Sequence, residues 1–283
     1  AQLSRGLGDV YKRQDSTPWG SVDDSLFFEY ILPFSSLNER RDNWRQDFYE
    51  RFFPIVKNAK SASEAAAILN NNIFEMVGVI YSTKRPKADQ SPYESIEAGL
   101  ASCTGLSFML IDACRSVGIP ARFVGTPMWY NNSGNHSWVE IWDNGWHFTG
   151  AFEPTGDRLN EGWFASLAAR AVEGHPEYGI YAATWKKTGI FFPMDWKPGV
   201  EKYYAYDVTS SYQKYLDDNF VSLRIKVVGK NGMRKKVLVD VKADNGFSFS
   251  GYSKDERNDA NDNLTLNLPI GSSCMINVND ISR

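Results

Sequence analysis

An apolar helical pattern over residues 104–118 gives way at once to strand-like segments, and this change limits the possible folds more than any other feature of the chain. The apolar positions of the pattern are Leu106, Phe108, Met109, Leu110, Ile111, Ala113 and Val117. Gly118 and Pro120 follow, which is a normal end for a helix. The segments "ARFVGTPMW", "HSWVEIW" and "WHFTGAF" then alternate apolar and other residues at period two, as strands do. This order predicts an α+β domain in which the helix packs on an antiparallel sheet.

The rest of the chain divides into sections by composition. Residues 1–14 have neither helical nor strand periodicity, and we interpret them as a non-native leader. Helical spacing of apolar residues predicts a helical N-terminal section over residues 15–60, followed by a central domain over residues 61–200. Residues 205–283 contain short β-rich runs separated by Gly, Asn and Asp turns, which is typical of a small β-sandwich. The last run stops without a clear terminus, which is consistent with a truncated sandwich.

Composition and charge limit the expected partners. The 283 residues are 42% hydrophobic and 14% aromatic, as in a globular protein with a substantial core. A net charge of -3 without a basic run gives no electrostatic reason to expect nucleic acid as a partner. No run approaches the roughly 18 apolar residues of a membrane helix, so no membrane span is expected. If residues 1–14 stand in place of a native leader, the protein is periplasmic or secreted, and otherwise it is cytoplasmic; the sequence leaves the location and the oligomeric state unknown.

The three cysteines have no CxxC or Cys/His spacing, so neither a zinc site nor a disulfide framework is expected. Cys103 lies in the first turn of the predicted helix, where unpaired N–H groups and the positive helix end favour a thiolate and can stabilise an oxyanion. The alternative is that Cys103 is a small buried hydrophobic residue, which is the commoner role of cysteine. Cys114, mid-helix among apolar residues, is predicted to be an inert core thiol.

A thiolate nucleophile needs a base, and the chain has three histidines. His136 opens the strand "HSWVEIW" directly after the turn-rich "NNSGN", at a strand end where functional side chains are often displayed. His147 lies in a strand between two aromatic residues, and His175 lies in the Gly- and Pro-bounded loop "EGHPEYG". We therefore select His136 as the candidate base.

The register of the predicted hairpin supplies a candidate carboxylate. Asn144 and Gly145 form the dipeptide preferred by two-residue type I′ turns. Such a turn places Glu153 directly opposite His136, close enough to accept a hydrogen bond from the imidazole and to fix its tautomer. A three-residue loop would instead bring Phe152 opposite His136. Asp157, in the following loop, is the competing acid.

A cysteine at a helix N-terminus, then "GIPARFV", "NHSWVEIW" and a carboxylate on the next strand resemble the transglutaminase-like superfamily, a branch of the papain-like cysteine enzymes. The resemblance covers roughly residues 60–165 and implies a papain-like fold, with residues 61–200 as the catalytic domain. In that family "GIPAR" follows the nucleophile helix, and the histidine stands two positions before an aromatic residue, as His136 and Trp138 do here. The family usually has aspartate in a "DPT"-like context, whereas this chain has "EPT", with Glu153 in the place of the third triad member.

The resemblance implies acyl chemistry at an amide bond through a thioester on Cys103. The chain would then be a cysteine acyltransferase or amide hydrolase that acts on protein, peptide or glycopeptide substrates and needs no cofactor or metal. The backbone N–H of Cys103 and the side chain of Gln90 are the candidate oxyanion donors. Trp129, Trp138 and Trp163 concentrate around the predicted site and are candidates for a substrate cleft.

A second hypothesis belongs to another class of protein. The same fold can serve as a catalytically silent module that binds glycans or proteins through its nine tryptophans and its C-terminal sandwich. The complete set of Cys103, His136 and Glu153 favours the enzyme. Preferential labelling of Cys103 by iodoacetamide near pH 6 would support the enzyme, and equal or absent labelling would support the binding module.

Overall fold

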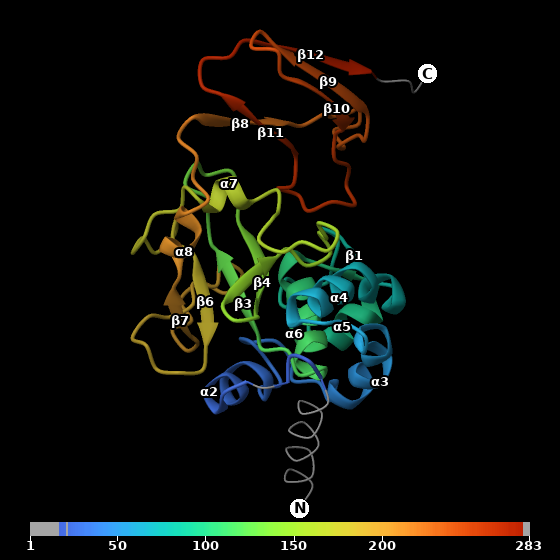
Figure 1. Ribbon diagram of the computed structural model, residues 1–283, viewed down its shortest axis with the longest axis vertical. Helices are drawn as coiled ribbons and strands as arrows, with labels where there is room; N and C mark the ends of the chain where they lie inside the picture. Colours follow the sequence, from blue (N-terminus) through green and yellow to red (C-terminus); the bar gives the residue numbers. More distant parts are fainter. Residues whose placement is uncertain (1–16, 21, 280–283) are drawn as a thin grey trace, which may run out of the picture.

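The computed structural model describes residues 17–20 and 22–279, which form a mixed α+β region followed by a β-rich region (Figure 1). The predicted leader over residues 1–14 lies outside the described residues. No helix in the described part of the chain is both long and apolar enough to cross a membrane.

The helices gather around α6, which spans Cys103–Ser116 and is buried along almost its whole length. Its N-cap is Ser102, and Gly118 follows its end with a φ of 85°, a left-handed conformation that glycine adopts without strain. The helices α3, α4 and α5 contact α6 and shield it from solvent (Figure 1). The helices that precede α6 are α2 (Asp24–Leu26), the π-helix η1 (Phe27–Ile31), α3 (Arg45–Val56), α4 (Ala62–Val77) and α5 (Pro92–Ala98).

A five-stranded antiparallel sheet carries the other half of the core. Its strand order is β5-β4-β3-β6-β7, and α6 packs on β3 and β4. The strands are β3 (Ala121–Thr126), β4 (His136–Trp142), β5 (Trp146–Thr149), β6 (Tyr181–Thr184) and β7 (Tyr204–Asp207), with the short helices α7 (Ala165–Ala168) and α8 (Thr209–Gln213) between and after them. The predicted α+β fold, with a helix that begins at Cys103 packed on an antiparallel sheet, is confirmed.

Alternation along β4 divides its side chains between two cores. Val139 and Ile141 face α6 and join the core of the helices. Trp138 faces the other way, where its indole N–H donates to the Tyr212 hydroxyl (2.7 Å) and its ring stacks on Phe164. His136 shares the face of Trp138, because the two positions differ by two residues. His136 therefore lies on the aromatic face of β4 and not on the face that α6 covers.

The predicted register of the β4–β5 hairpin is wrong by one residue. Val139 pairs with Thr149 and Trp142 with Trp146, so the loop has three residues, 143–145, in place of the two that were expected. Asn144 and Gly145 have positive φ values of 56° and 153°, a conformation that these residues adopt readily in turns. The dipeptide therefore indicates a turn, but it does not fix the number of residues in the loop. The strand β5 ends at Thr149, so neither Phe152 nor Glu153 pairs with His136 in the sheet.

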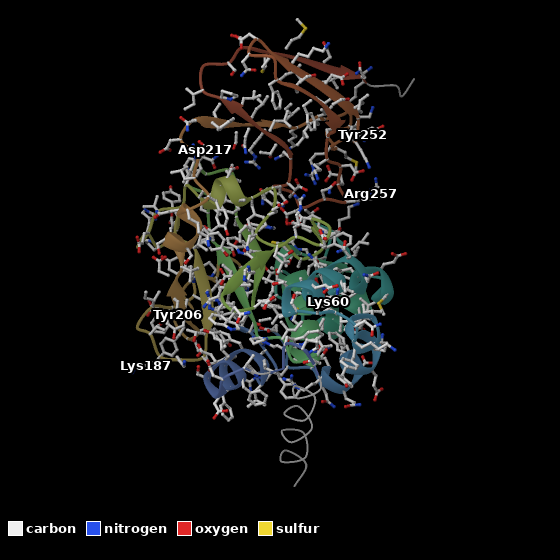
Figure 2. All side chains as sticks on the ribbon, viewed as in Figure 1. Lys60, Lys187, Tyr206, Asp217, Tyr252 and Arg257 are labelled. Carbon is white, nitrogen blue, oxygen red and sulfur yellow. The ribbon has the colours of Figure 1, made fainter. Side chains whose placement is uncertain are left out.

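The β-rich region consists of two small antiparallel sheets, ordered β10-β9-β12 and β11-β8, whose side chains meet in one apolar cluster. Its strands are β8 (Phe220–Ile225), β9 (Leu238–Ala243), β10 (Ser248–Tyr252), β11 (Leu264–Pro269) and β12 (Cys274–Asn279). The segment that joins β10 to β11 leaves this cluster and approaches the central region, where Figure 2 shows Arg257 near the boundary. The exact domain limits stay predictions.

Candidate active site

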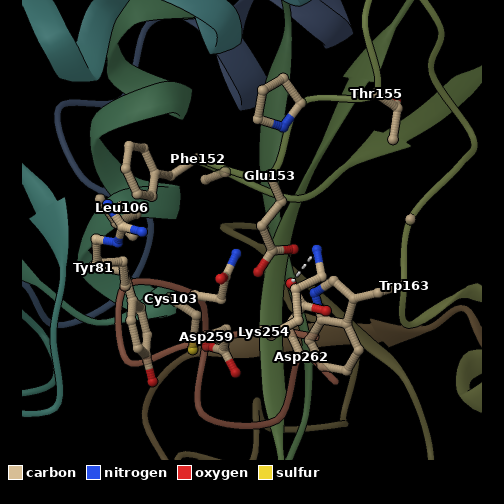
Figure 3. Close-up of a pocket in the computed structure, with 15 residues that line it drawn as sticks. Tyr81, Cys103, Leu106, Phe152, Glu153, Thr155, Trp163, Lys254, Asp259 and Asp262 are labelled. Atoms are coloured by element: carbon tan, nitrogen blue, oxygen red, sulfur yellow. Dashed lines mark ion pairs between the residues drawn. The ribbon is translucent and has the colours of Figure 1, made fainter. Parts of the chain in front are cut away.

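Cys103 is the first residue of α6 and is partly exposed in a cavity of about 250 Å³ (Figure 3). The Ser102 hydroxyl accepts a hydrogen bond from the Gly105 N–H (3.2 Å) and donates to the Ala88 carbonyl (2.7 Å). This cap fixes the first turn, so that the thiol lies at the positive end of the helix. The short strand β2 (Leu100–Ala101), which pairs in parallel with β1 (Ile80–Tyr81), leads into this turn.

His136 is the first residue of β4, and its side chain is 1% exposed. Its ring lies 4.7 Å from Trp163 and 4.9 Å from Phe164, measured between ring centroids. A hydrogen bond between the Thr104 and Ser137 hydroxyls (3.2 Å) joins the residues that follow Cys103 and His136. The sheet and the helix therefore hold the thiol and the imidazole together through their immediate neighbours.

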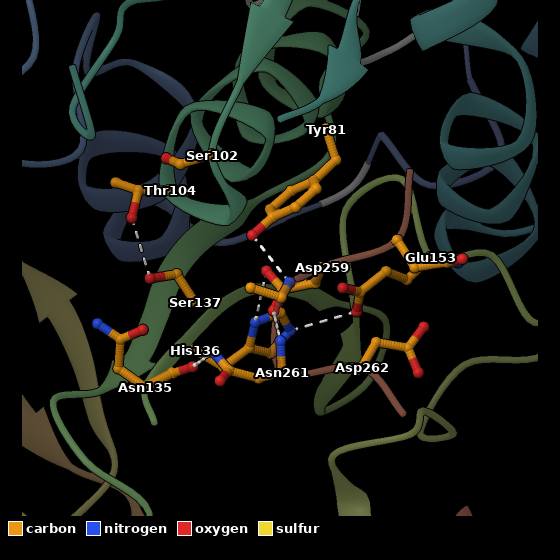
Figure 4. A network of polar contacts seen from close by, with 12 residues as sticks. Tyr81, Ser102, Thr104, Asn135, His136, Ser137, Glu153, Asp259, Asn261 and Asp262 are labelled. Atoms are coloured by element: carbon orange, nitrogen blue, oxygen red, sulfur yellow. Dashed lines mark hydrogen bonds and ion pairs between the residues drawn. The ribbon is translucent and has the colours of Figure 1, made fainter. Parts of the chain in front are cut away.

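Two carboxylates lie beside the imidazole, one near each ring nitrogen (Figure 4). Glu153 Oε2 lies 3.2 Å from Nε2, and Asp259 Oδ2 lies 3.8 Å from Nδ1. The sulfur of Cys103, a ring nitrogen of His136 and a carboxylate oxygen of Asp259 all lie within 4.8 Å of one another. Burial alone lowers the pKa of His136, but the neighbouring Glu153, Cys103 and Asp259 outweigh it and hold that pKa well above its ordinary value. The arrangement is consistent with a cysteine–histidine–acid triad.

Glu153 reaches His136 through a tight turn after β5. The Glu153 N–H donates to the Gly150 carbonyl (3.1 Å), and Phe152 adopts a positive φ of 66°. Asn70 of α4 stabilises this turn, because its amide donates to the Gly150 carbonyl (2.8 Å) and accepts from the Phe152 N–H (2.9 Å). A Cβ at position 150 would collide with the Glu153 carboxylate and displace it, so the glycine leaves room for the carboxylate in this position. The contact was predicted from a strand pair, but a turn produces it.

Asp259 comes from the segment between β10 and β11 and was not among the candidates taken from the sequence. The buried Arg234 donates to the carbonyls of Asn258, Asp259 and Asp262 at 2.7 to 2.9 Å. The Ala260 N–H donates to the Tyr81 hydroxyl (2.8 Å). Burial raises the pKa of Asp259, while the positive charge of His136 opposes that rise. The β-rich region thus contributes a fixed, buried carboxyl group to the site.

The same segment lines one wall of the cavity (Figure 3). Lys254 Nζ lies 3.3 Å from Asp262 Oδ2, and Arg257 is also at this wall. Burial, opposed mainly by Lys254, raises the pKa of Asp262 to about 6. The wall is therefore polar and carries charges of both signs, a composition that no pattern in the β-rich segment indicated.

The remaining candidates occupy different places. Gln90 is buried, and its amide nitrogen donates to the Glu94 carbonyl (3.2 Å) and the Leu100 carbonyl (3.0 Å), which leaves no N–H for an oxyanion. Trp163 lines the cavity, as expected of a cleft residue. Trp129 and Trp138 are almost fully buried behind His136, so in this structure they support the imidazole and do not line the cavity.

The histidines that were set aside have other partners. His147 Nε2 lies 3.0 Å from the Asp143 carbonyl, and its Nδ1 lies 2.8 Å from the Asn160 amide nitrogen. His175 Nδ1 accepts from the Glu177 and Tyr178 N–H groups in its loop. Cys114 is buried, and burial raises its pKa to about 12. These groups stabilise local structure away from the cavity.

The site is of the type found in cysteine enzymes, with a thiol at a helix N-terminus beside a buried histidine that has carboxylate neighbours. The family model of the transglutaminase-like superfamily core matches residues 51–151. The chain thus contains a transglutaminase-like superfamily core, as its motifs indicated, and the match includes Cys103 and His136 but ends before Glu153 and Asp259.

Two solved structures that resemble the chain are distant from it in sequence. A candidate cysteine protease from Cytophaga hutchinsonii is 19% identical with a TM-score of 0.37, over 47% of this chain and 43% of that one. Red sea bream transglutaminase is 10% identical with a TM-score of 0.37, over 92% of this chain and 60% of that one. The chain therefore spans less than two thirds of either structure, and neither supplies an activity for it. No curated protein sequence matches the chain.

Proposed function

We propose that the chain is a cysteine acyltransferase or amide hydrolase that forms a thioester on Cys103. The observation that carries the proposal is the placement of a thiol at the N-terminus of α6, within 4.8 Å of the ring of a histidine that is held between two carboxylates. An activated thiol beside a buried imidazole is the minimum that acyl transfer from an amide requires.

The two ring nitrogens of His136 have separate roles in this proposal. Nε2 is directed at Glu153, which leaves Nδ1 for the thiol. The Cys103 sulfur attacks the amide carbonyl, and Nδ1–H protonates the amine as the C–N bond breaks. An incoming amine or water then gives its proton to Nδ1 and attacks the thioester, which restores the thiolate. Glu153 fixes the tautomer and stabilises the imidazolium.

The cavity supports a substrate with a polar group beside the scissile amide. Its lining combines the indole of Trp163 with the carboxylates of Glu153 and Asp262 and the ammonium group of Lys254. Amides on protein, peptide or glycopeptide side chains have this mixed character. The backbone N–H of Cys103, in the first turn of α6, is a donor available to the developing oxyanion.

Mass spectrometry of the acyl-enzyme tests this function. The chain is incubated with a mixture of peptides that contain glutamine or glycosylated asparagine, quenched in acid and digested. We expect an acyl adduct on the peptide that contains Cys103, none in Cys103→Ala, and an unchanged adduct in Cys114→Ser. Release of ammonia or amine that persists in Cys103→Ala would contradict the proposal. Absence of both adduct and release, with peptide binding retained in Cys103→Ala, would favour the silent binding module.

A further inference from the structure

We infer that Cys103, His136 and Asp259 form a binding site for a zinc ion, which blocks the nucleophile reversibly. The inference goes beyond the proposed function, because metal binding by these three side chains does not require any catalytic turnover. It starts from the three donor atoms, a sulfur, a ring nitrogen and a carboxylate oxygen, which lie within 4.8 Å of one another.

The distances are close to those that a tetrahedral zinc ion needs. Zinc bonds of about 2.0 to 2.3 Å place neighbouring ligand atoms roughly 3.3 to 3.8 Å apart. The three donors therefore need to approach by about 1 Å, which side-chain rotation can supply. A fourth position faces the cavity of about 250 Å³, which has room for a water ligand.

The environment of His136 points to a ligand independently of the distances. Its Nδ1 is buried and faces the Cys103 thiol and the Asp259 carboxylate, whose Oδ2 lies 3.8 Å away, beyond hydrogen-bond distance. Its Nε2 is oriented by Glu153 at 3.2 Å, and a carboxylate on the second nitrogen is the usual support of a metal-binding histidine. A buried ring nitrogen that faces a thiol and a carboxylate at this spacing has the neighbours of a metal-binding histidine.

Asp259 is held firmly enough to act as a ligand. Arg234 fixes the carbonyls on both sides of it and its own, and Tyr81 fixes the next residue. Asp262, three positions further on, faces the same cavity but is paired with Lys254. The same segment therefore offers one carboxylate as a ligand and one as a matched control.

The donor set selects the metal. Thiolate and imidazole favour zinc and similar transition metals, whereas Ca²⁺ and Mg²⁺ prefer oxygen ligands throughout. Binding releases any proton on the Cys103 sulfur and on His136 Nδ1 to solvent. A sulfur bound to zinc is not free to attack a carbonyl, so the reactive form of the site is the metal-free form.

Metal binding to the full chain, freed of metal by a chelator, tests the inference without a substrate. Zn²⁺ is titrated in competition with a chromophoric chelator. We expect one tight site per chain, an affinity at least tenfold weaker in Asp259→Asn, and a change of less than threefold in Asp262→Asn. With Co²⁺ as the probe, a thiolate-to-metal absorption band should appear in the wild type and be absent in Cys103→Ser.

Protection of the thiol gives a second readout. Zn²⁺ should slow the alkylation of Cys103, Asp259→Asn should need at least tenfold more Zn²⁺ for equal protection, and millimolar Ca²⁺ or Mg²⁺ should not protect. Asp259→His supplies another zinc ligand and should restore binding. Restored binding would show that the loss in Asp259→Asn comes from the missing ligand and not from a folding defect. Equal affinities of the wild type, Asp259→Asn and Asp262→Asn would overturn the site. That result would leave the acyl adduct on Cys103, and hence the proposed function, unaffected.

Discussion

Replacing Glu153 by glutamine removes one negative charge from the site and little else. The glutamine amide has nearly the same volume, and its oxygen can still accept from Nε2–H of His136. The contact is 3.2 Å long, and the side chains of His136 and Glu153 are 1% and 14% exposed, so solvent replaces little of the lost interaction. The imidazolium that forms during the reaction therefore loses its nearest counter-ion.

The size of the effect follows from the second carboxylate. Removal of the orienting carboxylate of a serine protease, which has a single one, costs on the order of 10⁴ in rate. Here Asp259 remains 3.8 Å from Nδ1 and retains part of the stabilisation. We expect Glu153→Gln to lower kcat/KM at least a hundredfold, about 2.7 kcal/mol in the barrier.

Thiol alkylation provides an assay that needs no substrate. Glu153 raises the pKa of His136, so its loss lowers that pKa and depopulates the imidazolium that stabilises the thiolate. Iodoacetamide should therefore modify Cys103 at least tenfold more slowly at pH 6 in Glu153→Gln, measured with chelator present. Glu153→Asp should give intermediate rates, because it keeps the charge and shortens the side chain.

Asp157→Asn is the matched control, since Asp157 is exposed in the loop that follows Glu153. It should change either rate less than fivefold. If Asp157→Asn reduced the rates more than Glu153→Gln, the reasoning from the 3.2 Å contact would be refuted.

Three further perturbations test the surroundings of the site. Arg122→Met leaves Glu140 buried without its 2.6 Å ion-pair partner and should lower the free energy of unfolding by about 3–5 kcal/mol in urea titrations; unchanged stability would contradict a paired network. His147→Ala should alter the pH 6 alkylation rate of Cys103 less than twofold, and a larger fall would give His147 a part in the site. Because the folded state raises the pKa of Asp262 from 3.8 to about 6, it binds more protons than the unfolded state between these values, so this group makes stability fall as pH rises. Asp262→Asn should flatten that part of the urea midpoint profile, and an unaltered slope would show that Asp262 is not the group that titrates.

Local signals in the sequence predicted the helix and the placement of its cysteine. A continuous apolar pattern that ends at a glycine and a proline fixes α6 within a residue or two, because capping and backbone strain act over only a few residues. The alternating segments predicted β3, β4 and β5 in the same way. These features depend on neighbours in the chain, which the sequence displays directly.

The positions of the two carboxylates beside His136 could not be predicted from such local signals. The hairpin register depended on one extra loop residue, and the approach of Glu153 depended on Gly150 and on Asn70 from a separate helix. Asp259 lies far along the chain in a segment rich in Asn and Asp, where its sequence context is that of an ordinary turn. Only the packing of the β-rich region against the core, through Arg234 and Tyr81, gives it a special position.

The most direct test of the central claim is the site of alkylation at pH 6. An ordinary thiol with a pKa near 8.5 is less than about 1% ionised at that pH, and buried Cys114 is shielded further. With metal removed, limiting iodoacetamide followed by peptide mapping should label Cys103 well ahead of the exposed Cys274, with little label on Cys114. His136→Ala should abolish that preference. Labelling led by Cys274, or a preference for Cys103 that survives His136→Ala, would contradict an activated thiol held by His136.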